Sequence, residues 1–257
     1  MKSLLPFLKL WVVAIALLGV LPVCAQHVRT DAGAPAAALV AQTTAFLQHY
    51  VDKEGKVNYA AIQRDPDQLA ALLQSIADFD APRATAADRY AFYLNAYNVL
   101  VIGDIVQNYP LKSVQDMPDF FNKATHRVGG ERLTLDQLET DQLRRIFDDP
   151  RLHFALVCGT RSCPRLNRTA YVGTELFVQL NNQAKFALTD PAYVQVNPGA
   201  KTVRLPEIFK WYEADFSTSG KTGLGYVNQF RKDNNVPTWY AVEYYPYNWG
   251  LNDQAGK

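Results

Sequence analysis

The sequence has few cysteines and no long run of charge of one sign. Of its three cysteines, Cys24 lies in an N-terminal leader, so only Cys158 and Cys163 remain in the rest of the chain. Basic and acidic side chains nearly balance, at 26 and 25, and this balance does not indicate nucleic acid or an anionic membrane as a partner. Beyond the leader no segment is apolar enough to anchor in lipid, and we expect no transmembrane span in the mature protein.

Several well-known catalytic motifs are also missing. The sequence contains no glycine-rich phosphate loop, no G-x-S-x-G and no H-E-x-x-H. Internal repeats and low-complexity tracts are absent as well. Any reactive chemistry therefore depends on the cysteine pair and on the four histidines of the chain.

Residues 1–25 have the features of a signal peptide. Lys2 supplies a positive start, an uncharged apolar run extends from Leu10 to Val23, and small residues precede a cleavage point after Ala25. The run is shorter than the roughly 20 residues that cross a bilayer. We expect cleavage near Ala25 and export to the periplasm or the exterior as a soluble protein. Acylation of Cys24 would make a lipoprotein, but a small residue is expected just before such a cysteine.

Residues 26–257 are predicted to form a single α+β domain. Its central helix is expected at about 86–108, because Thr85 can cap its start and Pro110 lies just beyond its end. Asn95 and Asn98 share one face of this helix. Asparagine is unfavourable inside helices, so this pair either hydrogen-bonds neighbouring backbone or, in the case of Asn95, orients a catalytic imidazole.

The remaining elements are predicted to be short. The apolar run at 153–158 is typical of a buried strand. Gly129-Gly130 indicates the turn of a short hairpin, and Asn197-Pro198-Gly199 indicates another. A straight strand at 153–158 would point His153 and Cys158 to opposite faces, and only Cys163 could then meet His153.

Five fragments together resemble a known family. They are FYLNAYNVL at 92–100, GGERLTLDQLE at 129–139, DPRLHFALVCGTRSCPRL at 149–166, IFKWYEADF at 208–216 and YNWGLN at 247–252. The chain resembles the family catalogued as domain of unknown function 547 from about Asn58 to Asn252. That name implies no reaction. The resemblance implies motif positions of unknown role at these residues: Asn95, Asn98, His153, Cys158, Ser162, Cys163, Pro164, Trp211, Tyr212 and Asp215.

The cysteine pair has a structural interpretation. Export through an oxidising compartment favours a disulfide between Cys158 and Cys163. Such a short loop removes little chain entropy, so a bridge would mainly hold the turn. The spacing C-x₄-C differs from the C-x-x-C of thiol oxidoreductases, which argues against reversible redox work. This interpretation describes an exported binding or structural module stabilised by a disulfide.

The alternative is a thiol-dependent hydrolase or acyl transferase. Cys158 or Cys163 would be the nucleophile, His153 the base and Asn95 the orienter of the imidazole. His126 is the other candidate base. Backbone N–H groups of the loop after the strand could form an oxyanion hole.

A zinc site is the third interpretation of the same residues. His153, Cys158 and Cys163 are spaced as H-x₄-C-x₄-C, and Asp215 could be a fourth ligand. Paired zinc ligands are usually closer in sequence, and we predict no cofactor. Without a metal, Asp215 is interpreted as a cap or loop anchor, and Trp211 and Tyr212 as parts of the core.

Overall fold

The structure, a computed structural model, describes residues 33–217 and 222–256. It confirms the α+β class, with helices predominating over two small sheets. Asp31–Lys257 form one compact unit. The predicted leader, with Cys24, lies outside the described residues.

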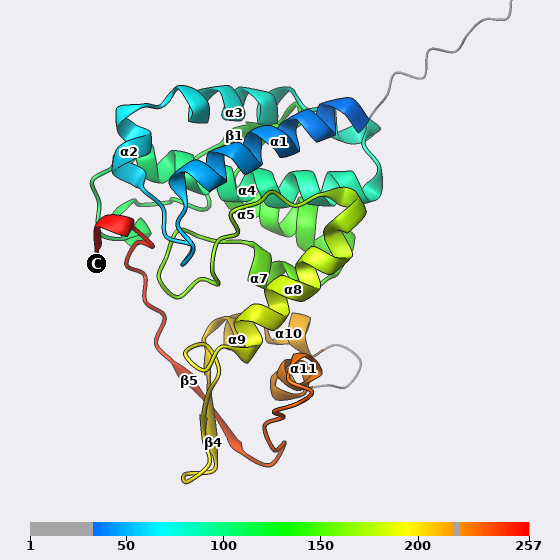
Figure 1. Cartoon of the computed structure of the whole chain (residues 1–257), viewed down its shortest axis with the longest axis vertical. Helices are drawn as coiled ribbons and strands as arrows, with labels where there is room; N and C mark the ends of the chain where they lie inside the picture. The colour runs from blue at the N-terminus through cyan, green and yellow to red at the C-terminus, as the bar shows by residue number, and fades with distance from the viewer. Residues whose placement is uncertain (1–32, 218–221, 257) are drawn as a thin grey trace, which may run out of the picture. The chain divides into compact units, whose positions relative to one another are not determined.

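Helices make up most of this unit (Figure 1). The α-helices are α1 (Gly33–Tyr50), α2 (Tyr59–Arg64), α3 (Asp67–Asp78), α4 (Ala86–Asn108), α5 (Leu135–Gln137), α6 (Arg145–Phe147), α7 (Leu152–Ala155), α8 (Leu176–Thr189), α9 (Ile208–Trp211), α10 (Glu213–Phe216) and α11 (Gly223–Phe230). A π-helical stretch, η3 (Leu138–Arg144), joins α5 to α6. The 3₁₀ turns are η1 (Ala81–Arg83), η2 (Val114–Asp116), η4 (Gly173–Glu175) and η6 (Gln254–Gly256).

The strands form two sheets. They are β1 (His126–Val128), β2 (Glu131–Leu133), β3 (Gln195–Asn197), β4 (Thr202–Pro206) and β5 (Ala241–Tyr245). β1 and β2 are an antiparallel hairpin whose two turn glycines both have positive φ, as a type I′ turn requires. β4 pairs antiparallel with β3 and parallel with β5. Both predicted hairpins are therefore confirmed.

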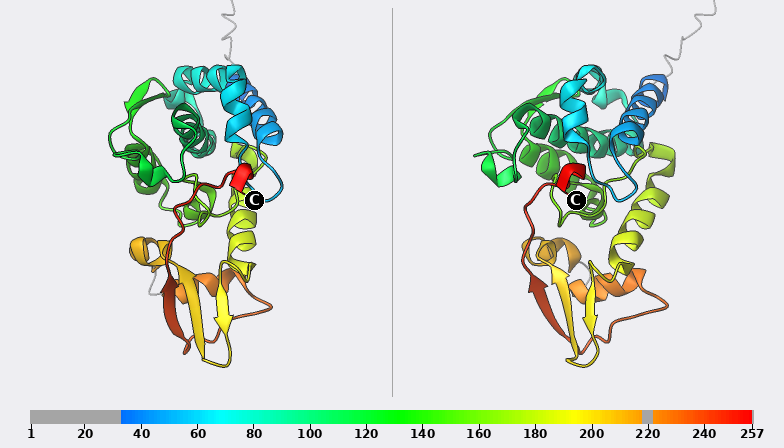
Figure 2. Two further views of the ribbon diagram at one scale, coloured as in Figure 1. Left: turned by 90° about the vertical axis from the view of Figure 1, so that its left-hand side faces the viewer. Right: turned by 60° about the vertical axis from the view of Figure 1, so that its left-hand side comes forward.

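The central helix is also confirmed, and its first and last residues are those expected. Thr85 accepts the backbone N–H of Asp88 as the N-cap. Every residue from Tyr90 to Val106 is buried, so α4 is enclosed on all sides. Figure 2 shows α1 and α3 alongside it. A helix buried all round belongs in the core of a domain, and α4 is the scaffold against which the cysteine segment packs.

A second apolar cluster lies around the three-stranded sheet. Phe154, Phe209 and Phe216 are its largest fully buried side chains, and helices α9–α11 supply much of the rest. Leu152 and Ala155, on either side of Phe154, pack instead into the cluster around α4. The short helix α7 thus belongs to both clusters, and it fixes the segment that leads to the cysteines.

The prediction of a strand at 153–158 is wrong. Residues 152–155 form the helix α7, and the chain is extended only from Leu156 onward. Its backbone bonds to a side chain instead of a neighbouring strand: Asn98 Nδ2 donates to Ala155 O and Val157 N–H donates to Asn98 Oδ1. A short apolar run cannot be assigned to strand or helix by periodicity alone. Because α7 is helical, the argument that placed His153 and Cys158 on opposite faces does not hold.

The end of the chain returns from the sheet to the helices, as the red segment in Figure 1 shows. Leu251 N–H donates to Lys112 O, and Asn252 N–H donates to Gly159 O. The motif YNWGLN at 247–252 therefore lies beside the loop that carries the cysteines.

Candidate functional site

The cysteine loop is fixed on both sides. Gly159 has a φ of +79°, and a Cβ there would collide with Ile105 Cδ1 of α4, so this position requires glycine. On the other side Arg161 N–H donates to Gly250 O at 2.8 Å, and Ser162 Oγ accepts the N–H of Asn248 at 2.7 Å. Ser162 thus helps to fix the cysteine loop against the segment that contains Asn248. The loop is presented on a rigid support.

The two cysteines face each other in this loop. Their Sγ atoms are 2.6 Å apart, and the structure holds them as free thiols, so the disulfide stays a prediction. Both are partly exposed. Cys158 N–H donates to Cys163 Sγ at 3.0 Å. A pair this close can form a bond with little movement of the backbone.

Hydroxyl groups surround the two sulfurs. Tyr247 Oη lies 3.1 Å from each sulfur, and Thr160 Oγ1 donates to Cys163 Sγ at 3.3 Å. Burial, followed by the nearby Cys163 and Cys158 charges, raises the pKa of Tyr247. Tyr247 therefore stays protonated and can donate a hydrogen bond to a thiolate.

The two thiols differ in acidity. Burial alone would raise the pKa of Cys163, but hydrogen bonds from Cys158, Thr160 and Tyr247 outweigh it and lower that pKa to about 6. The hydrogen bond to Cys163, burial and the Cys163 charge raise the pKa of Cys158 well above its usual value. The reduced pair is thus a Cys163 thiolate beside a Cys158 thiol at neutral pH.

A histidine–aspartate pair lies in the same region. His153 Nε2 is 2.7 Å from Asp215 Oδ2, and Arg144 binds both oxygens of that carboxylate, at 2.8 and 2.9 Å. Burial alone would raise the pKa of Asp215, but the bonds to His153 and Arg144 hold it well below its usual range. Asp215 is therefore the polar partner of the imidazole and not merely a cap or loop anchor.

Tyr212 completes this network. Its ring centroid is 4.2 Å from that of His153, and the Arg144 guanidinium lies 4.8 Å above the ring. The half-buried Glu139 faces the same groups. Burial raises the pKa of Glu139, and His153, the Tyr212 hydroxyl and Arg144 only partly offset it. This corner of the site can hold a proton.

The imidazole and the two thiols share one cavity of about 190 Å³. Six of the motif residues line it: His153, Cys158, Cys163, Pro164, Trp211 and Tyr212. Four of its other lining residues were missed by sequence reasoning: Tyr97, Glu139, Tyr247 and Trp249. All four occur inside the quoted fragments, so the signal was available. We refer to this as the inner cavity.

Trp211 is not part of the core, contrary to its interpretation from the sequence. Its side chain is 46% exposed. The centroid of its ring lies 5.0 Å from that of Tyr247 and 5.8 Å from that of Trp249. Tyr247 and Trp249 also contact each other. Three aromatic rings therefore cover one side of the inner cavity.

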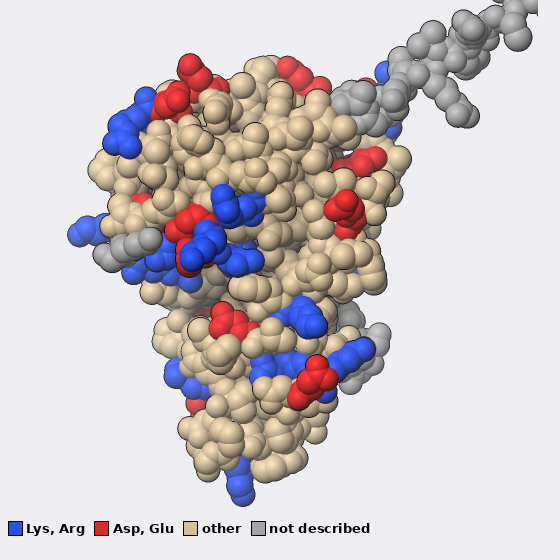
Figure 3. Space-filling view, viewed as in Figure 1, with Lys and Arg blue, Asp and Glu red and all other residues tan. Residues whose placement is uncertain are grey.

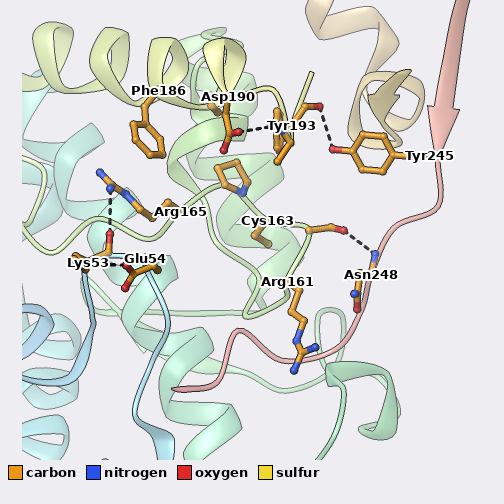
Figure 4. A pocket seen from close by; sticks show the side chains of 14 residues that line it. Lys53, Glu54, Arg161, Cys163, Arg165, Phe186, Asp190, Tyr193, Tyr245 and Asn248 are labelled. Atoms are coloured by element: carbon orange, nitrogen blue, oxygen red, sulfur yellow. Dashed lines mark hydrogen bonds and ion pairs between the residues drawn. The ribbon is translucent and has the colours of Figure 1, made fainter. Parts of the chain in front are cut away.

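A larger cavity of about 680 Å³ adjoins the loop, and we call it the outer cavity. Cys163 and Pro164 line both cavities, whereas Cys158 lines only the inner one of the two. Figure 4 shows Cys163 between Arg161 and Arg165 in the outer cavity. Cys163 is therefore the cysteine that can be approached from two directions.

The asparagine pair stands apart from this site. Asn95 Nδ2 donates to Tyr171 O at 2.9 Å, and Tyr171 N–H donates to Asn95 Oδ1 at 2.8 Å. Asn98 makes the equivalent two bonds to residues 155 and 157. Both asparagines therefore bind backbone. Asn95 was the candidate to orient the His153 imidazole, but the partner of that imidazole is Asp215. His126, the other candidate base, lies on β1, and its Nε2 is 3.2 Å from Oδ2 of Asp104 in α4. It does not line the inner cavity.

Metal binding has no geometric support within the described residues. No three His, Cys, Asp or Glu side chains there are grouped closely enough to hold a metal ion. His153 binds Asp215 while the cysteines bind each other. The absence of a cofactor stays a prediction, with zinc at His153, Cys158 and Cys163 as its alternative.

The surface and the helices bear on the expectations about partners. Acidic and basic side chains are interspersed on the face shown in Figure 3. Among residues 33–217 and 222–256, no helix combines the length and apolar character that a membrane crossing requires. Partners are not identified by these features.

No curated protein and no solved structure matches the chain. A family model does match a segment that includes α4 and both cysteines, but not Asp215 or Tyr247. Over residues 82–186 the chain matches the family described as protein of unknown function, DUF547, in agreement with the resemblance found in its sequence.

Proposed function

We propose that the chain is a thiol–disulfide exchange protein in which Cys163 is the attacking thiolate and Cys158 the resolving thiol. The observation that carries the proposal is the cysteine pair itself. Its sulfurs lie 2.6 Å apart, and their surroundings favour a charge on Cys163 over one on Cys158. A nucleophile and a resolving group with opposite shifts in pKa are what the reaction needs. The spacing C-x₄-C matters less than this geometry.

Atoms and electrons balance in this reaction. The Cys163 thiolate attacks one sulfur of a substrate disulfide, forms a mixed disulfide and releases the first substrate thiolate. Cys158 then loses its proton, which passes to that thiolate, and attacks Cys163 Sγ. The second substrate thiolate leaves and takes a proton from solvent. Two electrons move from the cysteine pair to the substrate, and the reverse sequence oxidises a dithiol.

Export is part of the proposal. The predicted leader would deliver the chain to a compartment where disulfides form and persist. If the pair is oxidised there and never reduced, the protein is the disulfide-stabilised module of the first sequence interpretation. Reversibility distinguishes the two.

The thiol-dependent hydrolase or acyl transferase is a second candidate, favoured by one observation. His153 and both cysteines line the same inner cavity. In the part of the chain that the structure describes, however, the sulfurs contact each other and the hydroxyl groups of Thr160 and Tyr247. The imidazole hydrogen-bonds to Asp215. A base must reach the proton that it removes, so the redox reaction fits these contacts better.

The test uses three proteins, all with Cys24→Ser so that only the two site cysteines can react. Each is reduced, freed of reductant and mixed with an aromatic disulfide that releases a coloured thiolate. The otherwise unchanged protein should release two thiolates and end as an internal disulfide. Cys158→Ser should release one and keep a mixed disulfide, visible as added mass. Cys163→Ser should react at least about 100-fold more slowly.

The two serine variants control each other, since each removes one sulfur from the same loop. If the unchanged protein releases a single thiolate, or if Cys163→Ser reacts as fast as Cys158→Ser, the proposal fails. Circular dichroism of all three establishes that the loop variants are folded.

A further inference from the structure

Cys163 has two accessible sides, and they are not equivalent. Cys158 lies on the side of the inner cavity, because it lines that cavity and not the outer one. Cys163 also lines the outer cavity, whose volume of about 680 Å³ exceeds the inner cavity's 190 Å³. A peptide-sized molecule fits the outer cavity only.

The exchange reaction selects between these sides. A thiolate displaces a sulfur from behind, so the attacking, central and leaving sulfurs lie close to one line. When Cys158 attacks Cys163 Sγ, the leaving substrate sulfur must lie on the far side of Cys163 from Cys158. Of the two cavities, the outer one is lined by Cys163 without Cys158, so we place the leaving sulfur there.

The charges around the outer cavity indicate what it binds. Arg161 and Arg165 come from the cysteine loop itself and lie on either side of Cys163 in Figure 4. Arg165 donates to Lys53 O at 3.1 Å and its guanidinium lies 3.9 Å from the ring centroid of Phe186. Neither contact neutralises its charge. Guanidinium groups are well suited to binding carboxylates.

The two carboxylates of the cavity have partners close by. Glu54 is 3.9 Å from Lys53, and Asp190 accepts the backbone N–H of Ala192 at 2.8 Å. Within the described residues neither carboxylate pairs with Arg165, which keeps its positive charge in the cavity that Cys163 lines.

We propose that the outer cavity is the substrate site and that it takes a carboxylate-bearing disulfide of peptide size, with Arg165 binding a carboxylate. This inference rests on the proposed exchange function. Arg165 is then a residue that determines specificity, and its charge should accelerate attack on anionic disulfides without changing the acidity of Cys163.

The test compares three aliphatic disulfides of similar size that differ in charge: dithiodipropionate, hydroxyethyl disulfide and cystamine. Each second-order rate constant for the reduced protein is divided by that for thioglycerol, a neutral thiol that none of the probes releases, which removes the intrinsic reactivity of the probe. At low salt the normalised rate should be about 10-fold higher for the dianion than for the neutral probe, and lowest for the dication. Raising the salt concentration should shrink this difference in the unchanged protein.

Variants locate the charge that is responsible. Arg165→Gln should reduce the preference for the dianion to about 3-fold or less, whereas Arg165→Lys should retain most of it. Arg83→Gln is the matched control, because Arg83 is an exposed arginine on η1, away from the cavity. It should leave the preference unchanged.

The outcomes separate this inference from the proposed function. If none of the probes reacts faster with the reduced protein than with thioglycerol, exchange itself is overturned. If all react quickly but without an order by charge, or if salt leaves the order unchanged, only the substrate inference is overturned. The salt series on the unchanged protein decides the matter even if Arg165→Gln does not fold.

Discussion

Two pairs of polar side chains lie close to the segment around residue 158, and they differ in what surrounds them. Asn95 and Asn98 are each 4% exposed, and each amide both donates to and accepts from backbone. Cys158 and Cys163 are partly exposed, and their partners are each other and two hydroxyl groups. The asparagines have no ionisable atom, whereas the cysteines have shifted pKa values.

The difference shows how this fold separates stability from chemistry. A buried amide that satisfies two backbone groups replaces the strand partner that residues 155–157 lack. The loop beyond them is therefore held without help from the sulfurs. Under the proposed function the cysteines can then ionise and exchange partners, which a structural pair could not do without loosening the fold.

The largest expected effect is on stability, at Asn98. Asn98→Ala leaves Ala155 O and Val157 N–H buried without partners, and we expect the free energy of unfolding to fall by about 3 kcal/mol. Asn108→Ala is the control on the same helix, because Asn108 is exposed and donates only to Asp104 O. It should cost about 0.5 kcal/mol. Urea unfolding of both variants measures this.

Cys163→Ser belongs in the same experiment and should change the unfolding free energy by less than about 1 kcal/mol. Equal losses for Asn98→Ala and Cys163→Ser would mean that the cysteine loop is also a structural anchor, and the contrast between the two pairs would be lost.

The next effect is on the acidity of Cys163. Its pKa of about 6 means that alkylation should rise with pH up to about 6 and then level off, whereas an ordinary thiol levels off above about 8.5. Cys158→Ala removes a donor to the thiolate and should move this inflection upward, with alkylation at a pH of about 6.5 slowed by about 10-fold.

Cys158→Ser is the matched comparison, because its hydroxyl can still donate to Cys163. Its inflection should stay well below that of Cys158→Ala. If the inflection is the same in both variants and in the reduced unchanged protein, the neighbouring sulfur does not cause the shift, and the two cysteines act independently.

Local signals in the sequence were sufficient for several elements. The Thr85 cap and Pro110 delimited α4, and Gly129-Gly130 located a hairpin, because each depends on a few adjacent residues. The strand at 153–158 failed because the decision depends on a distant side chain. Asn98 supplies the hydrogen bonds that a neighbouring strand would have supplied.

The site could be predicted only in part for the same reason. The resemblance picked out the cysteines, His153 and Asp215, but not which of them meet. Arg144 and Asp215 are 71 residues apart in the sequence, and Cys158 and Tyr247 are 89 apart. No periodic pattern connects such residues. Their contacts arise from the return of the chain end to the cysteine loop and from the packing of α10 beside η3.

The smallest expected effect concerns Asp215. It tests whether the His153 imidazole only stabilises the fold, as the asparagines do, or takes part in the chemistry of the cysteines. Asp215 has a lowered pKa in the folded state. Its contribution to stability is therefore fully present above the usual carboxyl pKa of 3.8, and it is lost as the pH falls from there toward the lower pKa of the folded state. Asp215→Asn should lower the unfolding free energy by about 1 kcal/mol at neutral pH, since the group is partly solvated. The difference from the unchanged protein should shrink below a pH of about 4.

Asp141→Asn is the control, because Asp141 forms an exposed ion pair with Arg145 at 3.1 Å, and it should cost about 0.5 kcal/mol or less. Asp215→Asn should also leave the rate of thiol exchange within about 2-fold, because neither sulfur bonds to His153. If Asp215→Asn instead lowers the alkylation rate of Cys163 by about 10-fold or more, with Asp141→Asn unaffected, the His153 imidazole must influence the reactivity of the sulfur. The inner cavity would then contain a Cys–His–Asp group, and the hydrolase or acyl transferase would replace thiol exchange as the function to test.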